Sequence, residues 1–403
     1  MEWKEVRLGD VCSKITDGSH FSPKAQTEGY PMLSVKDMRE YDFDFSNCKK
    51  ISYEDYLKME RDGCVPQIGD VLVAKDGSYL KEIFRCKEQR EIALLSSIAI
   101  FRPNSQLIDS RFLCYCLKSP RVYNYISLNC VSGSALPRII LKDFKGVNIR
   151  VPSLDDQRRI ANILSSLDRK IELNNKINAD LEEMAQAIFK NWFVDFEPFE
   201  DGKFVDSELG MIPEGWKVGT LGDITKNKSA KVKEKNDVKV LSPVTTGELV
   251  LSEEYFTKQV FSSSIAKYKI VNKGEFAYNP ARVNIGSLGR NEFDFDGCVS
   301  PVYVVFSVLE GYENYFDLFR KTDFFKDSVA SLAIGGVRQS LSYDDLSLIE
   351  TIIPSENIVE KFNNLYNQMK KTIKANKQEN SRLSLLRDTL LPRLMSGEIE
   401  IPE

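Results

Sequence analysis

The sequence predicts an α+β protein in which two pseudo-symmetric mixed α/β domains are separated by two long antiparallel coiled-coil helices. Three observations support this fold class. The chain of 403 residues contains an internal repeat, each copy ends in a long heptad pattern, and each copy begins with short apolar runs separated by Gly, Asn and Asp turns. Because a domain usually spans about 100–200 residues, two related domains fit the length.

The repeat is visible in short phrases that recur in the same order along the chain. Residues 3–11 match residues 216–224 through shared Trp, Lys, Leu, Gly and Asp positions, an offset of 213. Later phrases, such as the Val-Pro pair at 151–152 and the Ile-Pro pair at 353–354, match at an offset of 202. The repeat predicts four segments: a first domain over residues 1–152, a central helix over 153–200, a second domain over 201–354 and a C-terminal helix over 355–403.

Apolar residues recur at alternating steps of four and three in both predicted helices, as in a coiled-coil seam. The first seam runs from Ile160 to Ile188, and adding 202 gives its counterpart from Phe362 to Leu390. Two seam positions in each copy are asparagine, namely Asn174, Asn178, Asn376 and Asn380. We expect these amides to fix the helix register, and the alternative is that they face solvent at kinks. Each helix is expected to span about 35 residues, roughly 50 Å.

Four aromatic residues lie where the first helix gives way to a segment rich in Gly, Pro and acidic residues. They are Trp192, Phe193, Phe196 and Phe199, and Pro198 is expected to end the helix. The cluster fits either a partner-binding patch or a plug between the helix end and the neighbouring domain. The sequence alone favours neither interpretation.

The two globular segments are expected to be mixed α/β domains with one helix each. Strand candidates are short apolar runs such as residues 71–74 and 98–101 in the first copy and residues 302–306 in the second. The helix candidates are residues 110–119 and 313–322.

The composition excludes several function classes. A net charge of −4 argues against a uniformly basic coat for nucleic acid, although local basic faces remain possible. His20 is the only histidine, so His-ligated metal sites and catalytic triads have few residues to draw on. The eight cysteines form no Cys-x-x-Cys pair, and we expect reduced thiols rather than a metal site. The longest charge-free apolar stretch, residues 92–101, is too short to span a bilayer, so we expect a cytoplasmic protein without a membrane partner.

Basic and amide side chains gather in a small number of predicted loops. Six lysines lie between residues 226 and 239, a pattern that suits contact with phosphates. Arg recognises guanine and Asn or Gln recognises adenine in the major groove of DNA, and these residue types occupy turns in both copies. The candidates for DNA contact are His20, Lys75, Arg138, Lys226, Lys228, Lys231, Arg282, Asn284, Arg338 and Gln339. A solvated loop is the alternative for the lysine run, and any single candidate can instead be structural.

No segment has the pattern of an active site. Residues 279–282 read Asn-Pro-Ala-Arg and match the Asn/Asp-Pro-Pro-Tyr/Phe site of amino-methyltransferases only superficially, because the second Pro and the aromatic residue are missing. The glycine pair at 335–336 is not followed by the Gly-Lys-Ser/Thr of a phosphate-binding loop. Asp195, Asp201 and Lys203 lie in the linker rather than on a strand, which argues against a Mg²⁺-dependent nuclease site. We therefore predict that the chain carries no catalytic residues.

Several phrases resemble the specificity (S) subunit of Type I restriction–modification systems. Residues 151–174 resemble the central conserved region of that family, and residues 181–193 resemble its continuation. The phrase Gly-Met-Ile-Pro-Glu-Gly-Trp at 210–216 resembles the entry into a second target-recognition domain. Residues 386–397 resemble the C-terminal signature of the family, and residues 69–78 resemble a turn common in its recognition domains. The resemblance covers essentially the whole chain.

This resemblance implies two target-recognition domains that each read one half of a split DNA site, with paired helices that set the unread spacer. It implies two modification (methyltransferase) subunits that carry S-adenosylmethionine and methylate adenine, and restriction subunits that use ATP and Mg²⁺. The chain itself is then a non-catalytic subunit that binds double-stranded DNA and holds no cofactor. Glu356 and Asn357 depart from the Asp-Gln pair of the first copy and blur the start of the second helix. The alternatives are a self-contained DNA methyltransferase or nuclease, and a coiled-coil scaffold without DNA contact.

Overall fold

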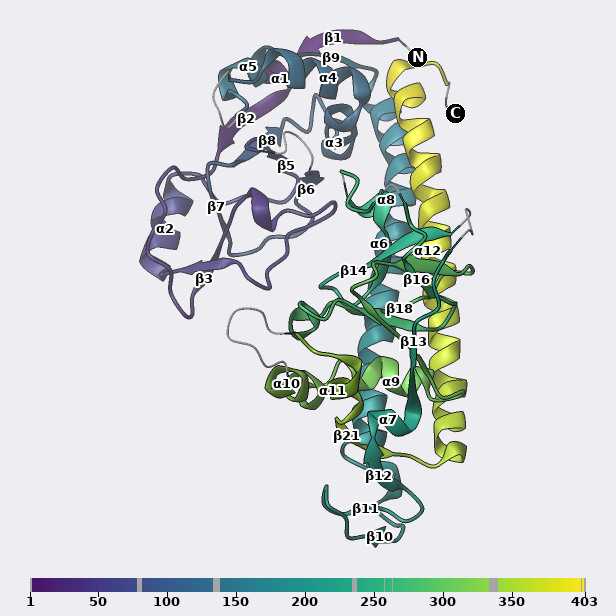
Figure 1. Cartoon of the computed structure of the whole chain (residues 1–403). Helices are drawn as coiled ribbons and strands as arrows, with labels where there is room; N and C mark the ends of the chain where they lie inside the picture. The colour runs from purple at the N-terminus through teal and green to yellow at the C-terminus, as the bar shows by residue number, and fades with distance from the viewer. Residues whose placement is uncertain are drawn as a thin grey trace. The chain divides into compact units, whose positions relative to one another are not determined.

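The computed structural model describes residues 2–77, 82–132, 138–233, 238–256, 258–262, 264–332, 340–399 and 401 (Figure 1). The chain divides into two compact units, the first made of Met1–Ile177 and Ala375–Glu403 and the second of Asn178–Lys374. The unit boundaries fall inside the two long helices, so each unit contains one globular domain and a part of each helix. Among the described residues, no helix is both long enough and apolar enough to cross a membrane.

The first unit contains a four-stranded, a three-stranded and a two-stranded sheet. Its globular elements are β1 (Lys4–Arg7), α1 (Leu8–Val11), β2 (Cys12–Asp17), β3 (Tyr30–Leu33), η1 (Val35–Asp37), β4 (Lys49–Ile51), α2 (Tyr53–Arg61), β5 (Val71–Ala74), β6 (Ile83–Arg85), β7 (Ala93–Leu94), β8 (Ile98–Pro103), α3 (Ser110–Lys118), α4 (Pro120–Asn129), α5 (Leu141–Gly146) and β9 (Asn148–Val151). The sheet orders are β2-β8-β5-β6, β4-β3-β7 and β1-β9. The long helix α6 (Leu154–Phe193) begins in this unit and α12 (Glu356–Ser396) ends in it.

The second unit is built from a longer set of short strands. Its globular elements are η2 (Glu197–Phe199), β10 (Phe204–Val205), β11 (Ile212–Pro213), β12 (Lys217–Thr220), α7 (Leu221–Ile224), β13 (Thr225–Lys228), β14 (Lys239–Pro243), β15 (Leu249–Leu251), α8 (Ser252–Tyr255), β16 (Lys269–Val271), β17 (Phe276–Tyr278), η3 (Val283–Ile285), β18 (Leu288–Arg290), β19 (Gly297–Val299), β20 (Val304–Val308), α9 (Glu313–Phe319), α10 (Asp323–Leu332), α11 (Tyr343–Ser347) and β21 (Glu350–Ile353). The sheet orders are β13-β20-β17-β18, β15-β14-β19-β16, β12-β21 and β10-β11.

The two units repeat one sheet topology, which confirms the fold class expected from the sequence. The order β2-β8-β5-β6 in the first unit corresponds to β13-β20-β17-β18 in the second, with antiparallel pairing at every step. The pair β1-β9 corresponds to β12-β21 in the same way. A bulge between Cys12 and Lys14 inserts one extra residue into β2. The bulge therefore accounts for a one-residue change in the offset between the two copies along this strand.

The central strands are buried on both faces, so they read as continuous apolar runs rather than as an alternation of apolar and polar residues. In β5, Val71 and Val73 belong to the core that includes α3, whereas Leu72 and Ala74 belong to the core shared with the three-stranded sheet. All four residues are fully buried. Burying each large apolar side chain contributes about 1.5–3 kcal/mol, so this sheet is a firm support for the loops at its ends.

The predicted helices 110–119 and 313–322 correspond to α3 and α9, and α9 is shorter than predicted because it ends at Phe319. The prediction of one helix per domain was wrong, because α4 and α5 follow α3, and α10 and α11 follow α9. These additional helices are short and half-apolar, so their sequences carry little of the periodicity that identifies a longer helix.

Both long helices exceed the predicted length, since α6 has 40 residues and α12 has 41. Within the first unit, Ile160 and Leu164 of α6 share a core with Leu391 and Leu394 near the end of α12. Within the second unit, the end of α6 shares a core with the beginning of α12. The two helices are therefore antiparallel within each unit. The expectation that Pro198 ends α6 was wrong, because the helix ends at Phe193 before the backbone turns left-handed at Phe196, with φ of 57°.

The buried face of α6 is wider than a coiled-coil seam. Ile160 and Leu164 are buried as the heptad pattern predicts. Leu167 is only half-buried, whereas the neighbouring Asp168 is buried, and Phe189 is likewise buried beside the half-buried Ile188. The reason is that each helix packs against a globular domain as well as against the other helix, so two adjacent stripes are covered.

The aromatic residues at the end of α6 form a plug within the second unit. The ring of Phe193 lies 5.8 Å from that of Trp216, 5.2 Å from that of Tyr315 and 5.1 Å from that of Phe362, measured between centroids. Phe193 and Trp216 are both buried. The structure therefore favours the plug over the partner-binding patch, and it joins the helix pair to the domain that follows.

Candidate nucleic-acid interface

In the first unit, three of the predicted loops meet at one edge of the central sheet. Strands β2 and β5 both run antiparallel to β8, which lies between them, so both end at the same edge. Asp17 is the last residue of β2, and Lys75 follows the last residue of β5. The N–H of Ile139 donates to the carbonyl of Lys75 at 2.9 Å, which brings the loop before α5 to the same edge.

Asp17 organises the basic side chains at this edge. Its carboxylate Oδ2 lies 2.8 Å from Nζ of Lys75 and 3.3 Å from Nε2 of His20. The His20 side chain is 70% exposed, whereas Lys75 is only 3% exposed. Lys75 therefore holds the buried carboxylate in place, and His20 is the member of the trio that faces solvent.

Arg138 is held at the same edge by a second acidic residue. Its Nε lies 2.9 Å from Oδ1 of Asp76, and its side chain remains 53% exposed. Asp76 and Arg138 are also paired through an isolated antiparallel bridge. The structure thus brings together His20, Lys75 and Arg138, which lie far apart in the sequence.

In the second unit, the corresponding edge lies at the ends of β13 and β17, which both run antiparallel to β20. Lys226 and Lys231 are exposed, and Lys228 is half-buried with its Nζ 3.8 Å from Oε1 of Glu275. Asn279 follows the last residue of β17 and begins the loop that carries the remaining described candidates. The lysine run and this loop are therefore neighbours across β20.

The loop after β17 is a compact turn that exposes Arg282 and Asn284. Oδ1 of Asn279 accepts the N–H of Ala281 at 3.1 Å, and the carbonyl of Arg282 accepts the N–H of Ser287 at 3.1 Å. Arg338 and Gln339, the last two candidates, lie outside the described residues. The neighbouring described residue Leu341 donates its N–H to the carbonyl of Pro280, in the same way as Ile139 bonds to Lys75 in the first unit.

Lys269 and Tyr303 lie at this second edge but were not among the candidates. Nζ of Lys269 donates to the carbonyl of Tyr303 at 2.6 Å, and Lys269 is the bridge partner of Lys231. Burial and the charge of Lys231 lower the pKa of Lys269. Burial raises the pKa of Tyr303, and the nearby charge of Arg282 opposes that rise. Lys269 starts a β-strand, so only the pairing of strands reveals that it belongs to the cluster.

Two of the seam asparagines meet in the first unit. Nδ2 of Asn174, which is fully buried, donates to Oδ1 of Asn380 at 2.8 Å and to Oε2 of Glu379 at 2.7 Å. Asn380 in turn donates to Oδ1 of Asn175 at 2.8 Å. Asn178 is buried and belongs to the second unit, and Asn376 is half-buried and belongs to the first. The Asn174 and Asn380 amides thus join α6 to α12 in one register.

The cysteines in the described part of the chain are free thiols that are buried or half-buried. All eight cysteines are free, and burial raises the pKa of Cys12 and Cys116 to about 12, so these thiols stay protonated near neutral pH. Among the described residues, no group of three or more His, Cys, Asp or Glu side chains is arranged to hold a metal ion.

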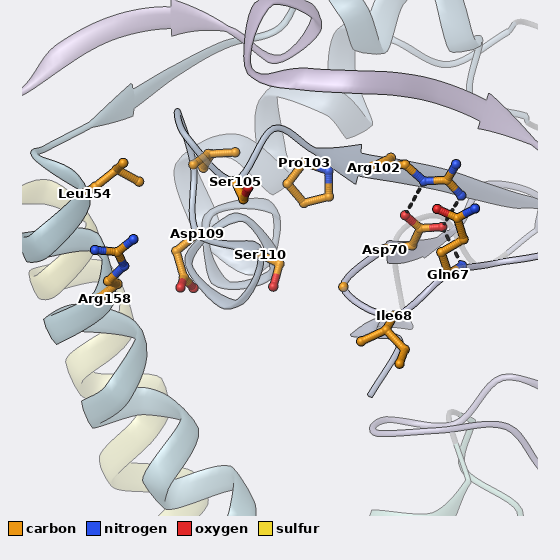
Figure 2. A pocket seen from close by; sticks show the side chains of 12 residues that line it. Gln67, Ile68, Asp70, Arg102, Pro103, Ser105, Asp109, Ser110, Leu154 and Arg158 are labelled. Atoms are coloured by element: carbon orange, nitrogen blue, oxygen red, sulfur yellow. Dashed lines mark hydrogen bonds and ion pairs between the residues drawn. The ribbon is translucent and has the colours of Figure 1, made fainter. Parts of the chain in front are cut away.

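A cavity of about 370 Å³ opens where β8 ends, at the end of the central sheet opposite to Asp17 and Lys75 (Figure 2). On its wall, Nε and Nη2 of Arg102 donate to the two carboxylate oxygens of Asp70 at 2.9 and 2.8 Å. Asp109 accepts the backbone N–H groups of Arg111 and Phe112 at the start of α3. Both carboxylates are already hydrogen-bonded, Asp70 to Arg102 and Asp109 to the backbone of α3, so we assign no ligand to the cavity.

Known proteins resemble the chain over its whole length. Residues 1–183 match the family described as the Type I restriction modification DNA specificity domain. The Type I restriction enzyme MjaIX specificity subunit of Methanocaldococcus jannaschii is 32% identical over 430 residues, which cover 100% of this chain and 94% of that protein. The Type I restriction enzyme HindI specificity subunit of Haemophilus influenzae is 24% identical, with 99% and 100% covered.

One solved structure has the same overall fold. The crystal structure of the Type I restriction–modification system S subunit from M. genitalium superposes with a TM-score of 0.58 at 15% identity, covering 98% of this chain and 96% of that one. This likeness supports the two-domain α+β fold.

Proposed function

Because the chain belongs to the family of Type I restriction–modification specificity subunits, we propose that each of its two units reads one half of a bipartite DNA site. The chain is a DNA-recognition subunit rather than a catalytic one. The observation that carries the proposal is the repeated sheet topology. Basic side chains lie at the corresponding sheet edge of both units, and the second edge adds the amide of Asn284. Two unlike sets of side chains on one scaffold suit the reading of two unlike half-sites.

The residues at the two edges divide into positioning and reading roles. The exposed Lys226 and Lys231 suit contact with phosphates, which orients a protein on DNA without reading its sequence. Arg282 suits a bidentate contact with guanine, and Asn284 suits one with adenine. His20, Arg138, Lys228, Arg338 and Gln339 complete the proposed DNA contacts. Lys75 acts indirectly, because its ammonium group holds Asp17 beneath His20.

The remaining parts of the proposal concern the helices and the partners. The segments 153–200 and 355–403 set the unread spacer and dock two modification subunits, and the domains over 1–152 and 201–354 read the half-sites. The modification subunits supply S-adenosylmethionine and transfer its methyl group to adenine. Restriction subunits add ATP- and Mg²⁺-dependent translocation and cleavage, and this chain binds none of these cofactors itself.

Arginine substitutions at the two edges should each relax only one half-site. Losing a bidentate base contact costs about 1–3 kcal/mol, so Arg282→Ala should weaken binding to the cognate duplex by roughly 5- to 150-fold and relax one base pair of one half-site. Arg138→Ala should relax a base pair of the other half-site. The measurement is selection of bound duplexes from a randomised library by the chain assembled with its modification subunits, at a fixed salt concentration.

Arg61→Ala serves as the control, because this arginine is exposed on α2 and is not among the proposed DNA contacts. Relaxation of the same half-site by both arginine variants would contradict the assignment of one half-site to each unit.

The purified chain incubated with DNA and either S-adenosylmethionine or Mg²⁺ should show no turnover. Methylation or cleavage by the chain alone would instead favour a self-contained methyltransferase or nuclease.

A further inference from the structure

In the first unit, the globular domain docks on two acidic residues of α6, Asp168 and Glu172. Oδ2 of Asp168 accepts a hydrogen bond of 2.5 Å from the hydroxyl of Tyr115 on α3, and Oδ1 accepts one of 3.2 Å from Tyr41. Glu172, one turn further along α6, forms an ion pair with Lys87. At these contacts α6 supplies negative charges, and the domain supplies phenols and an ammonium group. Arg387 of α12 adds a positive charge to the same surface, because its Nη1 lies 2.8 Å from Oδ1 of Asp168 and from Oε1 of Glu40 in the domain.

In the second unit, the domain docks on a basic stretch of α12. Lys370 forms an ion pair with Glu292, and its Nζ lies 4.0 Å from Oδ2 of Asp317 on α9. Nζ of Lys374, one turn further along, lies 2.7 Å from Oδ2 of Asp294. Here the helix supplies positive charges and the domain supplies carboxylates.

These two docking surfaces occupy equivalent positions in the two copies of the repeat. The offset of 202 that relates α6 to α12 pairs Asp168 with Lys370 and Glu172 with Lys374. The offset of 205 that relates β5 and β6 to β17 and β18 pairs Lys87 with Glu292. The sign of the charge is therefore reversed at each of these positions, on the helix and on the domain alike.

We propose that this reversed polarity matches each recognition domain to its own helix and excludes the exchanged arrangement, in which each domain would dock on the other helix. The exchanged arrangement is a real competitor, because the two domains share one sheet topology and the two helices share one apolar seam. Apolar contacts discriminate poorly between surfaces of similar shape, whereas facing like charges penalise the wrong partner.

The exchanged arrangement would bring like charges together at buried as well as exposed side chains. Exchange would place Lys87 against the lysines of α12, and Glu292, Asp294 and Asp317 against the acidic residues of α6. Asp317 is 4% exposed and is held by Arg320 and Lys370. Burial alone would raise the pKa of Asp317, but the charges of Arg320, Lys370 and Lys321 outweigh burial and hold the pKa well below its usual range. An ionised carboxylate in that position cannot tolerate a second one nearby.

The full-length chain allows a direct test by giving α12 the charges of α6. Lys370→Asp with Lys374→Glu should lower the thermal unfolding midpoint by about 5–10 °C, because about 2–4 °C is lost for each kcal/mol in units of this size. Lys361→Asp with Lys371→Glu makes the same charge change at exposed positions of the same helix and should lower the midpoint by less than about 2 °C. Adding Glu292→Lys, the residue type that Lys87 supplies in the first unit, should restore at least half of the loss.

The reciprocal pair in the first unit repeats the test with fewer changes. Lys87→Glu and Glu172→Lys should each lower the midpoint, and the double variant should recover it. The proposal is overturned if the control pair on α12 lowers the midpoint as much as the docking pair does. It is equally overturned if Glu292→Lys deepens the loss, or if the double variant in the first unit is no more stable than the worse single variant.

Discussion

Lengthening both long helices by one heptad is expected to lengthen the unread spacer of the DNA site by roughly two to three base pairs, with both half-sites unchanged. Seven residues add about 10 Å of helix at 1.5 Å per residue, and base pairs along the duplex are about 3.4 Å apart. A heptad rotates the helix face by only about 20°, so the packing seams stay nearly in line. Insertions between Ile177 and Asn178 and between Lys374 and Ala375 leave the contacts within each unit intact. The measurement is the methylated motif in cells that carry the lengthened chain with its modification subunits.

Two control insertions separate the effect of length from the effect of a damaged chain. The same heptad inserted in α6 alone should abolish methylation. The two helices then differ in length, so their apolar residues cannot meet in both units at once. Seven Gly and Ser residues placed in the exposed turn at residues 206–210 should leave the spacer unchanged. An unchanged spacer in the chain with both helices lengthened would reject the role of the helices as a ruler.

Replacing Arg387 by Ala is expected to destabilise the first unit by about 3–5 kcal/mol, the cost of leaving a buried charge without its partner. Nη1 of Arg387 lies 2.8 Å from Oδ1 of Asp168, from Oε1 of Glu40 and from the hydroxyl of Tyr41. The Arg387 side chain is 15% exposed and that of Asp168 is 10% exposed, so water replaces the guanidinium poorly. Urea unfolding of the full-length chain, followed by circular dichroism, measures the loss.

The neighbouring acidic residue provides a matched control for this variant. Oδ1 of Asp388 accepts a hydrogen bond of 3.0 Å from Nε of Arg387, but the side chain of Asp388 is 62% exposed. Because exposed ion pairs contribute little, Asp388→Ala should change stability by less than about 0.5 kcal/mol. Arg387→Ala combined with Asp168→Asn should be more stable than Arg387→Ala alone, because the unpaired charge has been removed as well. A loss below about 1 kcal/mol for Arg387→Ala would show that this ion network is not what joins the domain to both helices.

The order of the elements could be predicted from the sequence because it is repeated. Matching phrases, whose spacing along the chain falls from 213 to 202 residues, identify two copies of one domain. A heptad pattern of nine positions is long enough to identify a helix without ambiguity. The extra short helices α4, α5, α10 and α11 were missed, since five to ten residues carry too little periodicity. The end of α6 was misplaced because a left-handed residue, Phe196, ends the helical path before Pro198 does.

The candidate interface could be predicted only as a set of loops. The sequence identifies turns that carry Lys, Arg and Asn, but it does not say which turns share a sheet edge, because that depends on the pairing of β2 and β5 with β8. Burial also changes the role of single residues. Lys75 stands in a polar Lys-Asp-Gly-Ser turn that suggests an exposed side chain, yet its ammonium is buried against Asp17.

The docking charges were missed for a different reason. Arg387 occupies a seam position that the heptad pattern reserves for an apolar residue, and its equivalent in the first copy is Ala185. Treating that position as one more apolar layer hides the ion network around Asp168. Comparing the two copies position by position at the offset of 202 could have revealed the reversal of charge between Asp168 and Lys370, because it requires no structural information.

The central claim, that two units of one chain each read half of one DNA site, is tested most directly by sequencing the methylated adenines of cells. The cells should carry this chain together with its modification subunits, beside cells with the modification subunits alone. We predict methylation at a single motif made of two short specific half-sites separated by a spacer of fixed length. A continuous motif, a spacer of variable length or methylation that does not depend on this chain would contradict the claim.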